Sequence, residues 1–300
     1  LGDVYKRQKY NYLKSGRNPW QDPYWYRTEV VLPKSYKGKK VWLTLNGINY
    51  RADVWVNGRQ VADKKDIVGM FRRFKLDITG YARAGANNCI AIKIYQVDHP
   101  GVPTPGTQLK VFGPVRGHSY DIFKDETLKI SGGWDCAPVV RDRNMGIYQK
   151  VIVEATDEVL IENPFVITTL PKSTTMPMKV DTGLAKVNIK LEVRNTSAKL
   201  VEGKVNAWIT LLNEVKFPTY TKHMEGYLKP IKLTKKVALR AGERKVVELT
   251  PEDFPSLLIE NPYLWYPNGY GEQYLHHMKL SFSIGGKVSD TCLLYTSDAA

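Results

Sequence analysis

Cysteine is scarce in this sequence, and long apolar runs are absent. The cysteines are Cys89, Cys136 and Cys292 in a chain of 300 residues. They form no C-x-x-C pair and no zinc-ligand spacing with histidine, so we expect free thiols. No run approaches the roughly 20 apolar residues that span a bilayer. We therefore expect a fold held together without disulfides, and no membrane partner.

Common catalytic motifs are missing as well. The sequence contains no G-x-S-x-G, no H-E-x-x-H, no P-loop and no G-x-G-x-x-G that opens a helix. The adjacent His276 and His277 would point to opposite faces of a strand and could not grip one metal ion. His99 and His118 bracket a proline-rich loop, where we expect a surface role. No pair of carboxylates stands out as an acid/base couple, so we predict no catalytic set, no metal and no cofactor within this chain.

Positive charge and aromatic residues are what the sequence has in quantity. The formal net charge is +14, and aromatic residues make up 11% of the chain. The lysines and arginines are spread over most predicted strands instead of clustering, which indicates a solvated basic surface and no nucleic-acid partner. A polysaccharide that is anionic or free of amines stays open as a partner. With an apolar share of 43%, the length favours two domains, each with a sizeable core.

The hydrophobic pattern has a period of two, which is typical of half-buried strands. In the first half, strands are predicted over residues 24–32, 41–45, 51–56, 60–62, 71–78, 90–95 and 148–154. Asn57-Gly58 supplies the two positive-φ residues of a type I′ turn and predicts a tight hairpin. Only one helical turn is expected, near residues 80–84. In the second half, strands are predicted over residues 159–168, 187–193, 205–211, 237–239, 247–249 and 278–284, at a spacing typical of an immunoglobulin-like sandwich.

Two glycine- and proline-rich stretches interrupt the strands. Residues 99–117 hold four prolines and four glycines, and a loop of this length in a compact domain is usually functional or disordered. Residues 132–138, Gly-Gly-Trp-Asp-Cys-Ala-Pro, place an indole beside a carboxylate. Trp134 in this loop could stack on the apolar face of a sugar ring while Asp135 accepts hydrogen bonds from its hydroxyls. Packing of Trp134 beneath the sheets is the alternative.

The remaining tryptophans of the strands fit packing roles. We expect Trp42 and Trp208 to pack in the core or between sheets. Trp55 is out of phase with Val54 and Val56, so we expect it to cover the outer face of a sheet or a neighbouring domain.

Four motifs in order resemble glycoside hydrolase family 2, and its β-mannosidase and exo-β-glucosaminidase branch in particular. They are residues 23–28 (PYWYRT), residues 47–58 (GINYRADVWVNG), Trp134-Asp135 with residues 142–147 (DRNMGI), and residues 261–271 (NPYLWYPNGYG). The resemblance implies an all-β fold, with a galactose-binding-like jelly-roll sandwich over residues 9–156 and an immunoglobulin-like β-sandwich over residues 157–291. In the family a (β/α)₈ barrel with two catalytic glutamates follows. The resemblance therefore implies the non-catalytic part of an exo-acting retaining β-glycosidase that acts on β-linked glycosides.

The resemblance also implies which residues touch sugar. In this branch the Trp-Asp pair of the jelly-roll helps to form the subsite for the terminal sugar, which maps onto Trp134 and Asp135. Cys136 and Ala137 depart from the family, which usually has Trp and then Gly or Asn there. Residues 141–143, Arg-Asp-Arg, are expected to hold this loop by ion pairs.

Two further readings of the chain remain. Residues 1–8 and 292–300 resemble adapter read-through and are set aside from fold reasoning. A freestanding carbohydrate-binding protein made of two complete sandwiches is the alternative to an enzyme part. A basic β-module that binds anionic polymers is the third hypothesis, and its binding would weaken steeply with salt.

Overall fold

The computed structural model describes residues 22–100, 120–129, 143–172, 180–211 and 230–295, and their regular secondary structure is almost all strand. The helices among them are short 3₁₀ turns: η2 (Lys34–Tyr36), η3 (Tyr120–Lys124) and η6 (Pro255–Leu257). The chain divides into two compact units, residues 1–155 and 156–300. Within the described ranges, none of the helices is long and apolar enough to cross a membrane. The predicted all-β class, a jelly-roll followed by an immunoglobulin-like sandwich, is confirmed.

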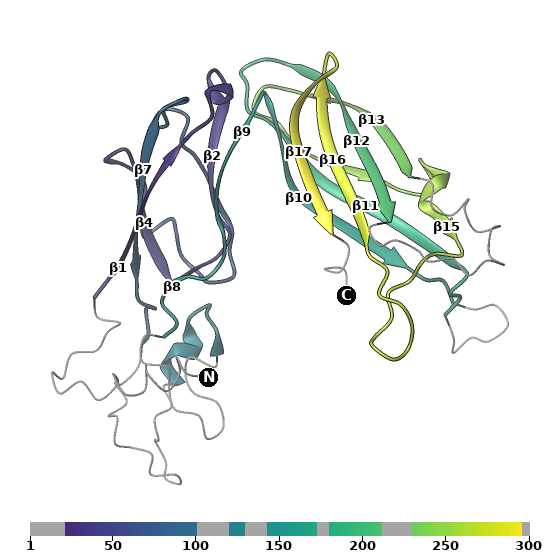
Figure 1. The fold of residues 1–300 in the computed structure, drawn as a ribbon, viewed down its shortest axis with the longest axis horizontal. Coiled ribbons are helices and arrows are strands. Elements are labelled where there is room, and N and C mark those ends of the chain that lie inside the picture. The colour runs from purple at the N-terminus through teal and green to yellow at the C-terminus, as the bar shows by residue number, and fades with distance from the viewer. Residues whose placement is uncertain (1–21, 101–119, 130–142, 173–179, 212–229, 296–300) are drawn as a thin grey trace, which may run out of the picture. The chain divides into compact units, whose positions relative to one another are not determined.

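The first unit is built from two antiparallel sheets and a small two-stranded ladder (Figure 1). One sheet has the order β1-β7-β4-β5, with β1 (Tyr24–Val31), β7 (Asn87–Tyr95), β4 (Arg51–Val56) and β5 (Arg59–Ala62). The other has the order β6-β2-β9, with β6 (Phe74–Asp77), β2 (Lys40–Leu45) and β9 (Val151–Thr156). The ladder pairs β3 (Ile48–Asn49) with β8 (Gly146–Ile147).

Alternation of side chains places the core of the first unit. On β7 the buried residues Ile90, Ile92 and Ile94 alternate with partly exposed ones, because successive side chains of a strand point to opposite faces. They pack in one cluster with apolar residues of β2, β4 and β6. The predicted hairpin turn is confirmed, since Asn57 and Gly58 have φ values of 52° and 80°.

Two predicted strands of this unit begin later than expected. The strand predicted over residues 71–78 is confined to β6, after a turn at Gly69, whose φ of 100° breaks the extended conformation. The strand predicted over residues 148–154 is also shorter at its start. Tyr148 and Gln149 both donate from their backbone nitrogens to the Gly47 carbonyl, 3.3 Å away in each case, and β9 begins only beyond that turn.

The second unit is a sandwich of two sheets. One sheet has β11 (Leu184–Asn195) between β10 (Val159–Thr169) and β14 (Arg244–Leu249), and β15 (Leu258–Glu260) also pairs with β11. The other has the order β13-β12-β16-β17, with β13 (Ile231–Leu239), β12 (Val201–Leu211), β16 (His276–Ile284) and β17 (Lys287–Tyr295). β17 pairs with β16 as far as Tyr295, so residues 292–295, set aside in the sequence analysis, are part of the sheet.

The prediction that Trp208 packs in the core or between sheets is wrong. Its side chain is 47% exposed, and the Lys232 ammonium lies 5.0 Å from the centroid of its ring. The inward set of β12 is Val205, Ala207 and Ile209, so a residue between Ala207 and Ile209 must face outward. The prediction for Trp42 is confirmed, since that residue is 1% exposed.

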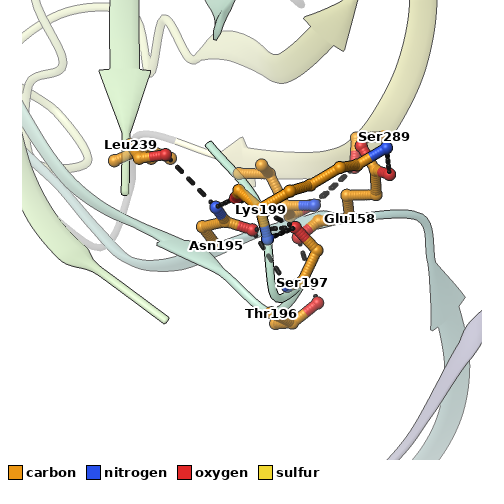
Figure 2. Close-up of polar contacts among 8 residues, drawn as sticks. Glu158, Asn195, Thr196, Ser197, Lys199, Leu239 and Ser289 are labelled. Atoms are coloured by element: carbon orange, nitrogen blue, oxygen red, sulfur yellow. Dashed lines mark hydrogen bonds and ion pairs between the residues drawn. The ribbon is translucent and has the colours of Figure 1, made fainter. Parts of the chain in front are cut away.

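A buried asparagine closes one end of the second unit. Asn195 is fully buried, and its Nδ2 donates to the carbonyls of Lys199, Leu239 and Arg240 at 2.7, 3.2 and 2.9 Å. Figure 2 shows its side chain pointing at Lys199 and Leu239, with Ser197 on its other side. The Lys199 ammonium lies 2.7 Å from the carboxylate of Glu158, the residue before β10. One amide therefore joins the β11–β12 turn to the end of β13.

Asn195→Ala tests this closure. The substitution leaves buried carbonyls without their donor, and we expect a loss of about 2–4 kcal/mol in the free energy of unfolding of the second unit. Ser197→Ala is the matched control, because Asn195 Oδ1 keeps the backbone nitrogen of residue 197 as a donor, and it should cost less than about 1 kcal/mol. Urea unfolding measures both values, and equal losses would contradict the assignment.

Candidate functional site

The site predicted from sequence belongs to two long connections of the first unit, residues 101–119 and 130–142. Trp134, Asp135, Cys136 and Ala137 lie outside the described residues, as do residues 101–119, so their sugar contacts stay a prediction. The structure does describe the residues that flank both connections, which are Pro100, Tyr120, Lys129 and Arg143. Their contacts define the frame from which the two connections start.

Arg143 joins the ends of the two connections. It is fully buried, and its Nε donates to the Pro100 carbonyl at 2.7 Å. Both Arg143 and Asn144 have positive φ, 56° and 54°, so the chain turns sharply where it rejoins the sheet. The ion pairs expected from residues 141–143 stay a prediction, because residues 141 and 142 lie outside the described ranges.

Asn49 on β3 holds the returning chain. Its Nδ2 donates to the carbonyls of Arg143 and Asn144 at 2.9 and 3.1 Å, and its Oδ1 accepts from the Thr127 hydroxyl at 2.9 Å. Asn49 is fully buried and Thr127 is 2% exposed. Buried polar groups of this kind are nearly always paired. One side chain thus links β3 to both flanks of the stretch that carries Trp134.

Asp125 forms the second set of buried hydrogen bonds in the frame. Its carboxylate is 2% exposed, accepts from the backbone nitrogen of His99 at 2.7 Å, and lies 2.6 Å from His99 Nδ1. The Lys129 ammonium donates to the carbonyls of Phe123 and Asp125 at 2.8 and 2.9 Å. His99 is half-exposed, as a surface histidine would be, but it is anchored by a buried carboxylate that the sequence analysis did not single out. His118 lies outside the described residues.

Close packing around β8 completes the frame. A Cβ atom added at Gly47 would lie 2.6 Å from the Tyr148 ring, so only glycine admits that ring. The Tyr148 hydroxyl donates to the Met70 carbonyl at 2.6 Å, and burial raises its pKa. The frame has no group of three metal-binding side chains, and none occurs elsewhere in the described ranges. Its chemistry is hydrogen bonding that positions loops.

The second unit holds a separate hollow. A pocket of about 210 Å³ lies at the end of its sandwich. Its lining is mostly apolar and includes Val187, Ile209, Tyr263, Trp265, Tyr274 and His276. Tyr263 and Tyr274 pack edge to face with ring centroids 4.9 Å apart, and burial lowers the pKa of His276. The motif of residues 261–271 therefore closes one end of the sandwich, and the pocket suits an apolar group better than the hydroxyl-rich rim of a sugar.

Models of two sandwich domains match the chain in order. A glycosyl hydrolase 2 galactose-binding domain-like model matches residues 8–149, and a glycosyl hydrolases family 2 model matches residues 161–296. This chain belongs to glycoside hydrolase family 2, as the resemblance implied.

Individual relatives agree on the branch. An exo-β-D-glucosaminidase of Streptomyces avermitilis is 30% identical over 94% of this chain and 25% of its own length. A mannosylglycoprotein endo-β-mannosidase of Lilium longiflorum is 26% identical over 84% of this chain and 23% of its own length. The crystal structure of an Amycolatopsis orientalis exo-chitosanase is 27% identical over 92% of this chain and 25% of that one, with a TM-score of 0.59. The chain spans about a quarter of the length of the curated relatives it matches.

Asn49→Ala tests the frame. The change leaves two buried carbonyls and the Thr127 hydroxyl without their partner, and we expect the first unit to lose about 3 kcal/mol in free energy of unfolding. Asn46→Ala is a matched control on the same turn, because the Asn46 amide makes one exposed hydrogen bond, to Lys150. Its cost should stay below about 1 kcal/mol in urea titrations. If both variants unfolded at the same urea concentration, the buried hydrogen bonds of Asn49 would contribute no more to stability than the exposed one of Asn46.

Proposed function

We propose that this chain is the non-catalytic front part of an exo-acting, retaining β-glycosidase that hydrolyses β-mannosides or β-glucosaminides. The observation that carries the proposal is the extent of the similarity. It runs through both units of this chain but through only about a quarter of the exo-β-D-glucosaminidases. The two sandwiches then act as scaffold and as one wall of a sugar subsite. A freestanding carbohydrate-binding protein is the alternative.

The described frame supports a loop that contacts sugar. Asn49 and Arg143 bring the flanks of both connections within one hydrogen bond of each other, so the connections start from one small area. Residues that orient a substrate need such a rigid base, because small displacements are costly in rate. In this proposal Trp134 stacks on the terminal sugar and Asp135 accepts hydrogen bonds from its hydroxyls.

Charge favours one of the two substrate types. A polymer of glucosamine carries ammonium groups, and this chain has a formal charge of +14. Residues 101–119 contain Lys110 and Arg116 and no Asp or Glu. Like charges disfavour encounter, most strongly at low salt. We therefore place β-mannosides ahead of glucosamine polymers as the substrate of the whole enzyme.

The chain alone should not hydrolyse glycosides. Retaining chemistry needs two carboxyl groups about 5–5.5 Å apart across the scissile bond, and in this proposal both belong to a further domain. Purified chain incubated with p-nitrophenyl β-mannoside and p-nitrophenyl β-glucosaminide should release p-nitrophenol no faster than a buffer blank. Sustained release that co-purifies with the chain and is lost on its denaturation would overturn the assignment.

Trp134→Ala tests the subsite in the enzyme encoded by the extended gene. Loss of stacking should lower kcat/KM for the β-mannoside by about tenfold to a hundredfold, or roughly 1.4 to 2.7 kcal/mol of transition-state stabilisation, with Tm unchanged. Trp208→Ala is the matched control, because this tryptophan is exposed on the other unit and should leave both quantities unchanged. An unchanged kcat/KM with a lowered Tm would show that Trp134 packs beneath the sheets.

A further inference from the structure

The outer face of the sheet β1-β7-β4-β5 carries aromatic rings and lysines, which we together call the tryptophan face. It consists of Trp25, Trp55 and Tyr95 together with Lys64 and Lys93. The rings of Trp25 and Trp55 lie with centroids 5.2 Å apart at an interplanar angle of 31°. Trp25 is 59% exposed, so most of its surface meets solvent. Trp55 lies on the outer face, as expected from sequence.

Strand register explains why the two indoles meet. Lys93 on the central strand β7 pairs with Trp25 of β1 on one side and with Asp53 of β4 on the other. In the next row, Ala91 of β7 lies opposite Trp55. Because alanine is small, the indole of Trp55 has room to lean across β7 towards Trp25, which lies two strands away on β1. The register of the sheet therefore lets the two indoles meet.

Two lysines of this face have their ammonium groups close to aromatic rings. The Lys93 ammonium lies 5.4 Å from the Trp25 ring centroid and 5.0 Å from that of Tyr95. The Lys64 ammonium lies 4.7 Å from the Tyr95 centroid. Among the residues that the structure describes, neither ammonium group has an ion-pair partner. Asp53 lies on the same face, opposite Lys93, so the two ammonium groups and this one carboxylate leave a surplus of positive charge.

The carboxylates around the face are already engaged. Glu29 accepts from Arg27 at 2.6 Å, and Asp98 accepts from both Nε and Nη2 of Arg51, at 2.7 and 2.6 Å. These contacts lower the pKa of Glu29, chiefly through Asn87 and Arg27, and the pKa of Asp98, chiefly through Arg51. The charge left over at this surface is therefore positive.

The hydroxyl of Tyr95 forms a hydrogen bond with Asp53 on the same surface. It donates to Asp53 Oδ2 at 2.5 Å, while Asp53 Oδ1 accepts from the backbone nitrogen of Lys64 at 2.8 Å. Burial and the neighbouring Asp53 carboxylate raise the pKa of Tyr95 to about 12. The hydroxyl therefore stays protonated at neutral pH, and the Tyr95 ring is held in place beneath both ammonium groups.

We propose that the tryptophan face is a second carbohydrate-binding surface, which takes a β-linked glycan that contains uronic acid units. Sugar rings stack on exposed indoles through their apolar faces, and the carboxylates of uronic acids pair with Lys93 and Lys64. A neutral glycan would leave the two ammonium groups without a partner, and a glycan of amino sugars would meet like charge. The choice of a glycan as occupant rests on the proposed function, whereas the choice of an acidic one rests on the charges of the face.

Trp208 offers an internal comparison. It is also exposed on a sheet face, with the Lys232 ammonium 5.0 Å from its ring centroid. It lacks the neighbouring indole that Trp25 has, since its cross-strand neighbours are Lys232 and Lys279. A glycan chain needs several stacked units to gain affinity, so an isolated Trp–Lys pair should bind it poorly. Comparing the two positions therefore distinguishes binding to a pair of neighbouring indoles from attraction to surface charge.

The test uses isothermal titration calorimetry on the intact chain with a β-1,4-linked mannuronate tetrasaccharide, and with neutral β-1,4-mannotetraose for comparison. We expect the acidic sugar to bind and the neutral one to bind at least about tenfold more weakly. Trp25→Ala and Lys93→Gln should each weaken binding of the acidic sugar by about tenfold. Trp208→Ala and Lys232→Gln, the matched controls, should leave the affinity unchanged. Trp25 is exposed enough for its variant to keep the wild-type Tm.

Each other outcome overturns the proposal in a distinct way. Absence of binding by the wild-type chain removes the site. Equal losses in the Trp25 and Trp208 variants would show non-specific attraction to a basic surface, and equal affinity for both sugars would remove the role of the lysines. Trp134→Ala separates this site from the proposed function, because Trp134 is not one of the residues that define the tryptophan face and its loss should leave this binding intact. The hydrolysis assays test the glycosidase assignment, and the calorimetry tests the tryptophan face, so either can fail without the other.

Discussion

The first unit depends on the pairing of one buried amide. Asn49 lies within the fold without solvent, so its donor and acceptor must find partners inside, and it finds them in Thr127 and in the two carbonyls that follow the Trp134 stretch. The sheets could pair without it, but the returning chain would have no fixed position. Asn195 does the same in the second unit, where one amide holds the β11–β12 turn to the end of β13. Both sandwiches thus fix loops with an asparagine, whose side chain imitates the backbone.

Most of the strands could be predicted because alternation of side chains is a local property. Ile90, Ile92 and Ile94 indicate their strand without reference to any partner. Trp208 shows how the same rule was misapplied. Its phase between Ala207 and Ile209 already pointed outward, yet its size and apolarity favoured burial. Phase prevails because backbone geometry sets the direction of a side chain, and an outward indole is tolerated where a lysine stem covers it.

The frame of the candidate site could not be predicted in the same way. Asn49 and Thr127 are 78 residues apart, and Asn49 and Arg143 are 94 apart, so no window of sequence contains both partners. Asp125 looked like any other carboxylate until the fold buried it against His99. Trp134 and Asp135 were identified by resemblance and by residue type. The residues that fix the two flanks of this stretch were identified only by the three-dimensional pairing.

The tryptophan face has little to contribute to stability. Exposed cation–π contacts are worth about 0.5–1 kcal/mol, and exposed ion pairs such as Arg27–Glu29 less than about 1 kcal/mol. A large indole that is 59% exposed gains less from folding than a buried one, since the hydrophobic contribution follows the area removed from water. Stability therefore does not account for two neighbouring indoles on a face whose lysine ammonium groups lie near Trp25 and Tyr95. Recognition of an acidic, ring-shaped ligand accounts for both features together, because stacking uses the rings and the carboxylates use the charge.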